Sequence, residues 1–224
     1  MATKTAITQG KTATIIGATG LIGSNLLALL QKDPYFKAIR VLSRRAVSFD
    51  HPEIQTLVID FADKAAFKTA IAGSDAVFCA VGTTQKKVKG DKVAYRKVDY
   101  DIPTHAAQFC AETGCPHFLL VSSVGANSQS NNFYLKLKGE VEDRLRTMNI
   151  GTISIFRPSM LLGKREERRF GEGIAQALMR SLSFLIPSQY KPIGAGEVAR
   201  AMAAASRKGA PGFHIYHHAE MMAL

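Results

Sequence analysis

The chain has 224 residues, of which 46% are hydrophobic, and its 29 Lys and Arg residues outnumber its 18 Asp and Glu residues. This length can bury one sizeable core, and α/β folds commonly reach it as one domain, so we expect a single domain over residues 1–224. The three cysteines are odd in number and have no C-x-x-C spacing. This pattern argues against a disulfide framework and a zinc site. We therefore expect a reducing, cytoplasmic location and no bound metal.

A net charge of +11 is compatible with nucleic acid, an anionic membrane or a phosphate-rich ligand. The basic clusters at 86–89 and 164–169 contain none of the interleaved aromatic residues that stack on nucleic-acid bases, which disfavours a nucleic-acid partner. No run approaches the roughly 20 apolar residues that cross a bilayer, and residues 1–10 lack the apolar segment of a signal peptide. We expect a soluble monomer or homodimer that acts on a small molecule.

Short apolar runs alternate with helical patterns along the chain, which predicts a Rossmann-like, doubly wound parallel sheet with helices on both faces. Residues 157–210 depart from the alternation, and we expect them to form a small C-terminal lobe that selects the substrate. Pro103 lies inside a helical stretch and either kinks the helix or marks its start. The expected strands lie near residues 12–16, 39–43, 54–59, 76–81, 117–122, 151–156 and 213–216, and the expected helices near 21–32, 63–71, 92–113 and 133–148.

A glycine-rich turn, Gly17-x-x-Gly20-x-x-Gly23, separates the first expected strand from the first helix. In that position the backbone N–H groups and the helix dipole suit a pyrophosphate. The spacing is a variant of the commoner G-x-G-x-x-G fingerprint, and alone it also fits an ordinary tight turn. Its place between strand and helix favours a dinucleotide site, with candidate contacts at Gly17, Thr19, Gly20, Leu21, Ile22 and Gly23.

Arg44 and Arg45 stand at the end of the second strand, where many NAD-binding folds place an acidic residue. Guanidinium groups bind phosphate bidentately, whereas a carboxylate would repel the 2′-phosphate of NADP. The alternative is a solvated arginine pair on a loop. The pair lies about 20 residues after the glycines, which favours NADP(H) as the cofactor.

Two further strand ends carry candidate cofactor contacts. Asp60 follows the third strand and could accept a hydrogen bond from the adenine amino group, with Phe61 beside the ring. Its alternative role is to cap the helix expected from residue 63. Ala80, Val81 and Gly82 follow the fourth strand, where small residues let the backbone approach the ribose and pyrophosphate, although a plain glycine turn fits equally.

Tyr134 and Lys138 are spaced i and i+4, which places a phenol and an ammonium on one helix face. A free tyrosine titrates near pH 10, so acid or base catalysis near neutrality requires roughly 3–4 kcal/mol of phenolate stabilisation. The lysine and an oxidised nicotinamide can supply that field. Ser123, or alternatively Ser122, ends the preceding strand and could hydrogen-bond a substrate carbonyl. The alternatives are a surface tyrosine and an ordinary loop serine.

The motifs, taken in chain order, resemble an atypical short-chain dehydrogenase/reductase: the glycine turn, Ser123, Tyr134-x-x-x-Lys138 and Phe156-Arg157-Pro158. The strings 43–45, 78–84, 132–142 and 156–162 are similar to those of the Tat-interacting-protein (HTATIP) oxidoreductase group. The resemblance implies an NADPH-binding Rossmann protein. It implies cofactor contacts at Thr19, Gly20, Leu21, Ile22, Arg44, Arg45, Val81, Gly82, Tyr134, Lys138, Leu161 and Arg169.

These observations predict an NADP(H)-dependent oxidoreductase that exchanges a hydride with a carbonyl or alcohol. Tyr134 would be the acid/base, Lys138 would hold the nicotinamide ribose and stabilise the phenolate, and Ser123 would orient the substrate oxygen. One alternative is an NADPH-binding sensor that acts through a protein partner. Another is a nucleotide-sugar epimerase, although its larger C-terminal domain fits poorly into the roughly 70 residues after the sixth strand.

Overall fold

Seven parallel strands build the central sheet in this computed structural model, which describes residues 10–49, 51–162 and 187–224. Their spatial order is β3-β2-β1-β4-β5-β6-β9, and every neighbouring pair is parallel. The order reverses between β1 and β4, where open α/β sheets have their ligand crevice. The strands are β1 (Lys11–Ile16), β2 (Phe36–Ser43), β3 (Ile54–Val58), β4 (Ala76–Cys79), β5 (His117–Val121), β6 (Thr152–Phe156) and β9 (Gly212–Tyr216).

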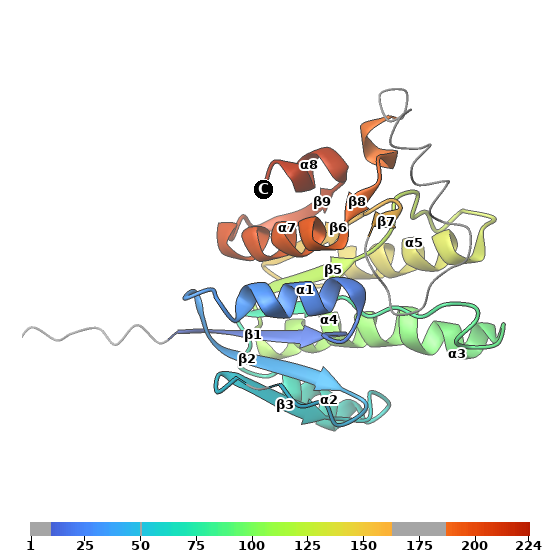
Figure 1. The fold of residues 1–224 in the computed structure, drawn as a ribbon. Helices are drawn as coiled ribbons and strands as arrows, with labels where there is room; N and C mark the ends of the chain where they lie inside the picture. The colour runs from blue at the N-terminus through green and yellow to red at the C-terminus, as the bar shows by residue number, and fades with distance from the viewer. Residues whose placement is uncertain (1–9, 50, 163–186) are drawn as a thin grey trace, which may run out of the picture.

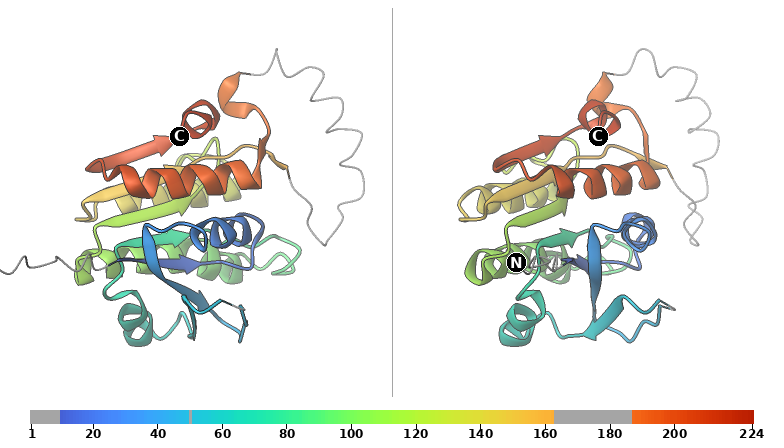
Figure 2. Two further views of the ribbon diagram at one scale, coloured as in Figure 1. Left: turned by 60° about the vertical axis from the view of Figure 1, so that its left-hand side comes forward. Right: turned by 90° about the vertical axis from the view of Figure 1, so that its left-hand side faces the viewer.

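Helices cover both faces of the sheet (Figure 1), and two further views show the same layers from other sides (Figure 2). On one face α1 packs beside α7, and on the other α2 packs beside α4, which also contacts α5. The helices are α1 (Leu21–Leu30), α2 (Lys64–Ile71), α3 (Lys92–Arg96), α4 (Ile102–Thr113), α5 (Phe133–Arg146), α7 (Ala195–Lys208) and α8 (His218–Met222). A π-helical turn η1 (Lys97–Asp101), a 3₁₀ turn η3 (Ser188–Tyr190) and a small sheet of β7 (Leu161–Leu162) and β8 (Ile193–Gly194) complete the described elements.

The sheet separates two hydrophobic clusters. One contains Leu26 of α1 and Met202 of α7, and the other contains Phe67 of α2, Ala106 of α4 and Leu145 of α5, all with 0% exposure. Burying a large apolar side chain stabilises the fold by roughly 1.5–3 kcal/mol, so these clusters fix the helices against the strands. The central strands β4, β5 and β6 are buried along almost their whole length, which explains their largely apolar sequences, whereas the edge strands β3 and β9 are only partly buried.

The predicted sheet and its flanking helices are confirmed, and the helical stretch 92–113 contains a detail that the pattern did not resolve. It consists of α3, η1 and α4 in direct succession. Pro103 lies in the first turn of α4, where a residue without an N–H is tolerated. The proline therefore lies near the start of α4, while helical turns continue before it.

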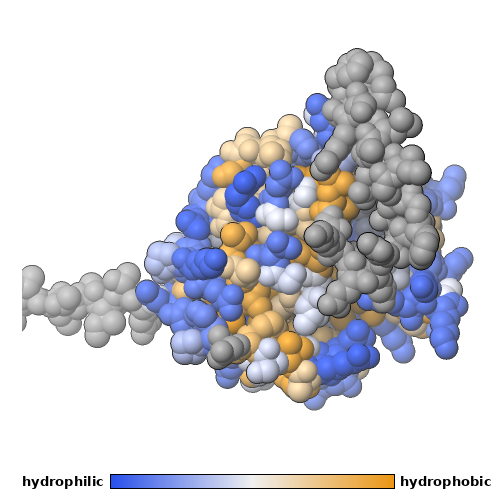
Figure 3. Space-filling model, in the orientation of Figure 1, coloured by the Kyte–Doolittle hydropathy of each residue, from blue (hydrophilic) through white to orange (hydrophobic). Residues whose placement is uncertain are grey.

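The segment expected to form a lobe, 157–210, is described only in part. Residues 163–186 lie outside the described residues, and so does the candidate contact Arg169. Of the remainder, α7 packs against α1 in the layer that covers the sheet. None of the helices that the structure describes is both long and apolar enough to cross a membrane. On the face shown in Figure 3, hydrophobic residues are interspersed with hydrophilic ones.

Candidate active site

A cleft of about 680 Å³ opens at the carboxyl ends of β1, β4 and β5, where the strand order reverses. Six segments contribute to it: the glycine turn with the start of α1, the loop after β4, the turn η1, the end of β5, the first turns of α5 and residues 158–161 after β6. Segments distant in the sequence therefore meet at one edge of the sheet. The predicted site residues that line the cleft are Thr19, Gly20, Leu21, Ile22, Ala80, Val81, Gly82, Ser123, Tyr134, Lys138 and Leu161, and Ser122 also lines it.

The glycine turn has no room for larger side chains. Gly17 has a φ of +92°, and a Cβ there would lie 2.8 Å from the carbonyl carbon of Ala80. A Cβ on Gly23 would lie 2.0 Å from the carbonyl oxygen of Gly17. Gly20 is the N-cap of α1 and has no side chain that could cap the first-turn N–H groups. The turn thus presents uncapped backbone donors at the cleft, as a bound pyrophosphate requires.

The start of α5 positions Tyr134 and Lys138. Asn132 caps this helix, because its side-chain oxygen accepts hydrogen bonds from the N–H groups of Tyr134 (3.0 Å) and Leu135 (3.1 Å). Tyr134 is 36% exposed, whereas Lys138 is 4% exposed. The ammonium nitrogen lies 5.8 Å from the centre of the Tyr134 ring. The two groups are therefore one helical turn apart, with the cation beneath an accessible phenol.

Asp99 was not predicted as a site residue, yet it contacts both sides of the cleft. Its Oδ1 lies 3.1 Å from the Nζ of Lys138, and the two side chains are 2% and 5% exposed. Its Oδ2 accepts a hydrogen bond of 2.8 Å from the backbone N–H of Thr83. Burial lowers the pKa of Lys138, but the charge and hydrogen bond of Asp99, together with the nearby Tyr134 and Cys79, outweigh burial and leave the pKa above its usual value. The lysine is therefore held as a cation.

The two serines at the end of β5 differ in their partners. Ser122 is buried, and its hydroxyl donates a 2.5 Å hydrogen bond to Glu142. Glu142 also accepts bonds from Arg157, at 2.5 Å from Nη2 and 3.0 Å from Nε. Ser123 is half-buried, and its hydroxyl donates to the neighbouring carbonyl of Val124 at 3.2 Å. The Ser122 proton is thus engaged in a buried ionic network, and the Ser123 hydroxyl has only a weak local acceptor.

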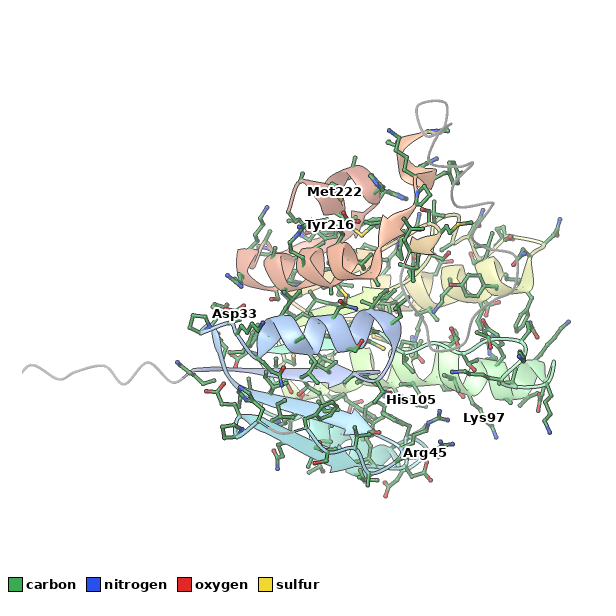
Figure 4. The ribbon with its side chains drawn as sticks, in the orientation of Figure 1. Asp33, Arg45, Lys97, His105, Tyr216 and Met222 are labelled. Carbon is green, nitrogen blue, oxygen red and sulfur yellow. The ribbon has the colours of Figure 1, made fainter. Side chains whose placement is uncertain are left out.

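Arg44, Arg45, Asp60 and Phe61 are not among the described residues that line the cleft. Both arginines are exposed after the end of β2, as Figure 4 shows for Arg45. The Asp60 carboxylate accepts a hydrogen bond from the N–H of Ala62 at 2.9 Å. Phe61 packs edge-on against the core residue Phe67, at 4.8 Å between ring centres. The cap of α2 is Asp63, so the alternative role of Asp60 as this cap is wrong.

The three cysteines lie in the interior of the described part of the chain. Cys79, Cys110 and Cys115 are buried free thiols. Burial raises the pKa of Cys79 to about 12, which leaves it a neutral thiol. No group of three or more His, Cys, Asp or Glu side chains within the described ranges could hold a metal ion.

The comparisons with known proteins agree with this geometry. A family model described as NAD(P)H-binding matches residues 17–176, which include the glycine turn, Tyr134 and Lys138. The chain belongs to this family. It is 34% identical over 177 residues to Protein HTATIP2 of Rattus norvegicus, covering 78% of this chain and 72% of that protein. It is 33% identical over 204 residues to Protein FMP52, mitochondrial, of Candida albicans, covering 88% and 89%. These relatives confirm the resemblance to atypical short-chain dehydrogenase/reductases of the HTATIP2 group.

Two solved structures with similar folds hold a sugar nucleotide or NAD⁺. A UDP-N-acetylglucosamine 4-epimerase from Methanobrevibacter ruminantium superposes with a TM-score of 0.71 at 16% identity, covering 93% of this chain and 76% of that one. The enzyme WbmH of Bordetella bronchiseptica, in complex with NAD⁺, has a TM-score of 0.70 at 19% identity, covering 92% and 75%. At these identities the likeness concerns the fold alone. Family and fold together support a nicotinamide cofactor, and the glycine turn has the shape to accept one.

Proposed function

We propose that the protein is an NADP(H)-dependent oxidoreductase that exchanges a hydride with a carbonyl or alcohol group of a small molecule. The observation that carries this proposal is that Tyr134 lies beside a buried Lys138, itself ion-paired with Asp99, in the cleft that the glycine turn borders. A bound nicotinamide would supply or accept the hydride, and the protein would supply orientation and the proton.

Each polar group of the cleft has a role in this proposal. The Tyr134 hydroxyl exchanges a proton with the substrate oxygen, and the Lys138 cation stabilises its phenolate form. Ser123 donates a hydrogen bond to the same substrate oxygen. Ser123 is the better candidate of the two serines because the hydroxyl of Ser122 already donates to Glu142.

A Tyr134→Phe variant tests the proton-transfer role. Turnover should fall by roughly 10²–10⁴-fold, while the affinity for NADPH stays close to that of the unaltered protein. NADPH oxidation followed at 340 nm over a broad panel of aldehydes and ketones provides the assay. Tyr35→Phe is the matched control, because Tyr35 has a similar exposure of 37% and does not line the cleft. Undiminished turnover in Tyr134→Phe would remove this residue from the mechanism.

The same panel separates the enzyme from an NADPH sensor, the other function class that the sequence leaves open. Tight NADPH binding without oxidation by any member of a wide carbonyl panel would favour a sensor that acts through a protein partner. Turnover of a nucleotide sugar without net oxidation of NADPH would instead favour an epimerase-like reaction.

The preference for NADP(H) rests on Arg44 and Arg45, two exposed cations at the end of β2. We expect the double variant Arg44→Gln/Arg45→Gln to bind NADPH about 10–100-fold more weakly, since charge-assisted hydrogen bonds contribute about 1.5–3 kcal/mol. NADH binding should stay unchanged. Lys37→Gln, an exposed cation near the opposite end of β2, is the control. Equal affinities of the unaltered protein for NADPH and NADH would refute the preference.

We also assign the protein to the cytoplasm, because its three described cysteines are free thiols. The relative from Candida albicans is named mitochondrial. Fractionation of cells that express the protein tests the assignment, and recovery in the mitochondrial fraction would overturn it.

A further inference from the structure

The π-helical turn η1 places a buried acid where the surrounding helix is apolar. Asp99 is 2% exposed and lies on the face of this stretch that also buries Tyr95, Ile102 and Ala106. A buried carboxylate costs free energy unless it is paired and hydrogen-bonded. Single π-helical turns are rare and occur frequently at functional sites. The free-energy cost of burying Asp99 must therefore be offset by its partners, and its place in a π-helical turn points to a functional role.

The two carboxylate oxygens of Asp99 contact residues in two different segments that line the cleft. Oδ1 pairs with Lys138 of α5 at 3.1 Å, and Oδ2 accepts the N–H of Thr83 in the loop after β4 at 2.8 Å. The carbonyl oxygen of Thr83 in turn accepts a 3.3 Å hydrogen bond from the hydroxyl of Tyr95. One carboxylate thus fixes the lysine and the neighbouring loop in the same arrangement.

Asp99 is the one carboxylate among the charged and titratable groups that face Lys138 in the described chain. The others are Tyr134 from α5 and Cys79 from β4, with Tyr95 of α3 nearby. Burial raises the pKa values of Cys79 and Tyr95 to about 12, so both are neutral near pH 7. A buried lysine without a negative partner releases its proton readily. Asp99 is the one of these groups that forms an ion pair with Lys138.

We propose that Asp99 is a positioning residue of the active site, which keeps the Lys138 ammonium charged and in place and anchors the loop after β4 through Thr83. This inference rests on the proposed function, since it assigns Asp99 a role in preparing Lys138 to hold the cofactor and to support Tyr134. Without Asp99 the lysine would be a buried cation with no partner. It would then be charged only at lower pH.

The pH dependence of NADPH binding tests this role. In Asp99→Asn, the amide oxygen can still accept the Thr83 N–H, but the ion pair is lost. We expect near-normal NADPH affinity at pH 5.5 and an affinity about tenfold lower at pH 9.5, because the unpaired Lys138 loses its proton between these pH values. Lys138→Met should be weakened equally at both pH values. Asp101→Asn, the matched control two residues away, should follow the unaltered protein and so correct for the titration of the cofactor itself.

A loss of affinity in Asp99→Asn that is the same at both pH values, or no loss at either, would overturn the proposal. A purely structural role for Asp99 predicts a loss that does not depend on pH. If the unaltered protein binds no NADPH at all, the proposed function fails. A measurement without cofactor then tests separately whether Asp99 stabilises the Lys138 cation.

That measurement is urea unfolding of the single and double variants. We expect Asp99→Asn to lower the unfolding midpoint and the added change Lys138→Met to restore part of it, because the unpaired buried charge is then removed. The deficit of Asp99→Asn should also shrink as pH rises from 5.5 to 9.5, since a neutral lysine is less costly to bury. A double variant that is no more stable than Asp99→Asn would refute the proposal. The same comparison applies if Asp99→Asn fails to fold, because the double variant should then recover part of the lost stability.

Discussion

Replacing Gly139 by alanine should destabilise the protein, although alanine favours helices. Gly139 lies where α5 crosses the loop after β5, directly after Lys138. A Cβ at this position would lie 2.1 Å from the backbone nitrogen of Ser128 and 2.2 Å from the carbonyl carbon of Asn127. Neither is the end of a flexible side chain, so α5 or the loop must move. Overpacking of this kind costs about 1–3 kcal/mol or more.

Gly196→Ala in α7 is the matched control. The nearest described atom to its Cβ would be Oδ1 of Asn25 at 3.5 Å, an ordinary contact. This variant gains up to about 1 kcal/mol from helix propensity. Because Gly139→Ala has the same gain in helix propensity, the difference between the two alanine variants is the steric cost, about 1–3 kcal/mol in the free energy of unfolding, with Gly139→Ala the less stable.

Urea unfolding followed by circular dichroism gives this difference, and thermal midpoints should separate by about 2–4 °C for each kcal/mol. NADPH titration provides a second readout, because a shift of α5 displaces Tyr134 and Lys138 relative to the glycine turn. We expect weaker NADPH binding in Gly139→Ala and unchanged binding in Gly196→Ala. A Gly139→Ala protein as stable as Gly196→Ala would refute the steric reasoning.

Two further predictions concern the buried residues Glu142 and His117, which are not among the described residues that line the cleft. Glu142→Ala should cost about 3–5 kcal/mol in urea unfolding, because it leaves Arg157 and Ser122 without their partner. Glu140→Ala, which removes a surface pair with Arg96, should cost no more than about 1 kcal/mol, and equal losses would contradict the distinction. Burial lowers the pKa of His117 to about 4, below the usual 6.5, so the unfolded chain takes up a proton that the folded protein does not. Stability should therefore fall by up to about 3 kcal/mol between pH 6.5 and pH 4, and His117→Asn, compared by the same unfolding assay, should show a flatter profile.

Much of the fold could be predicted from the sequence because a parallel sheet is buried on both faces. Its strands are then continuous apolar runs, and the glycine turn marks the β1–α1 junction. The π-helical turn η1 could not be predicted in this way. An i→i+5 turn is rare, and the apolar spacing of three and four residues in this stretch did not separate it from a continuous α-helix. Pro103 signalled an irregularity but not its kind.

The candidate site was predictable where residues follow the carboxyl ends of strands, because these ends meet at one edge of the sheet. Asp99 was missed, although the sequence holds a signal for it. It shares helical spacings of four, three and seven residues with Tyr95, Ile102 and Ala106, which places an acid on an apolar face. Glu142 carries the same signal on the buried face of α5 with Leu145. A charged residue on an apolar stripe is more informative than the stripe itself, but its partner depends on tertiary packing.

In the proposed mechanism, the charges that attract the cofactor are different from the charges that support proton transfer. Each buried carboxylate in the described part of the chain pairs with a cation: Asp33 with Arg207, Asp99 with Lys138 and Glu142 with Arg157. The net charge of +11 therefore comes from residues outside these pairs. Exposed cations such as Lys86 and Lys87 line the cleft. An anionic cofactor would meet this positive rim first. The Lys138–Asp99 pair beneath Tyr134 is neutral as a whole, so it can support the phenolate without repelling the positively charged ring of an oxidised nicotinamide.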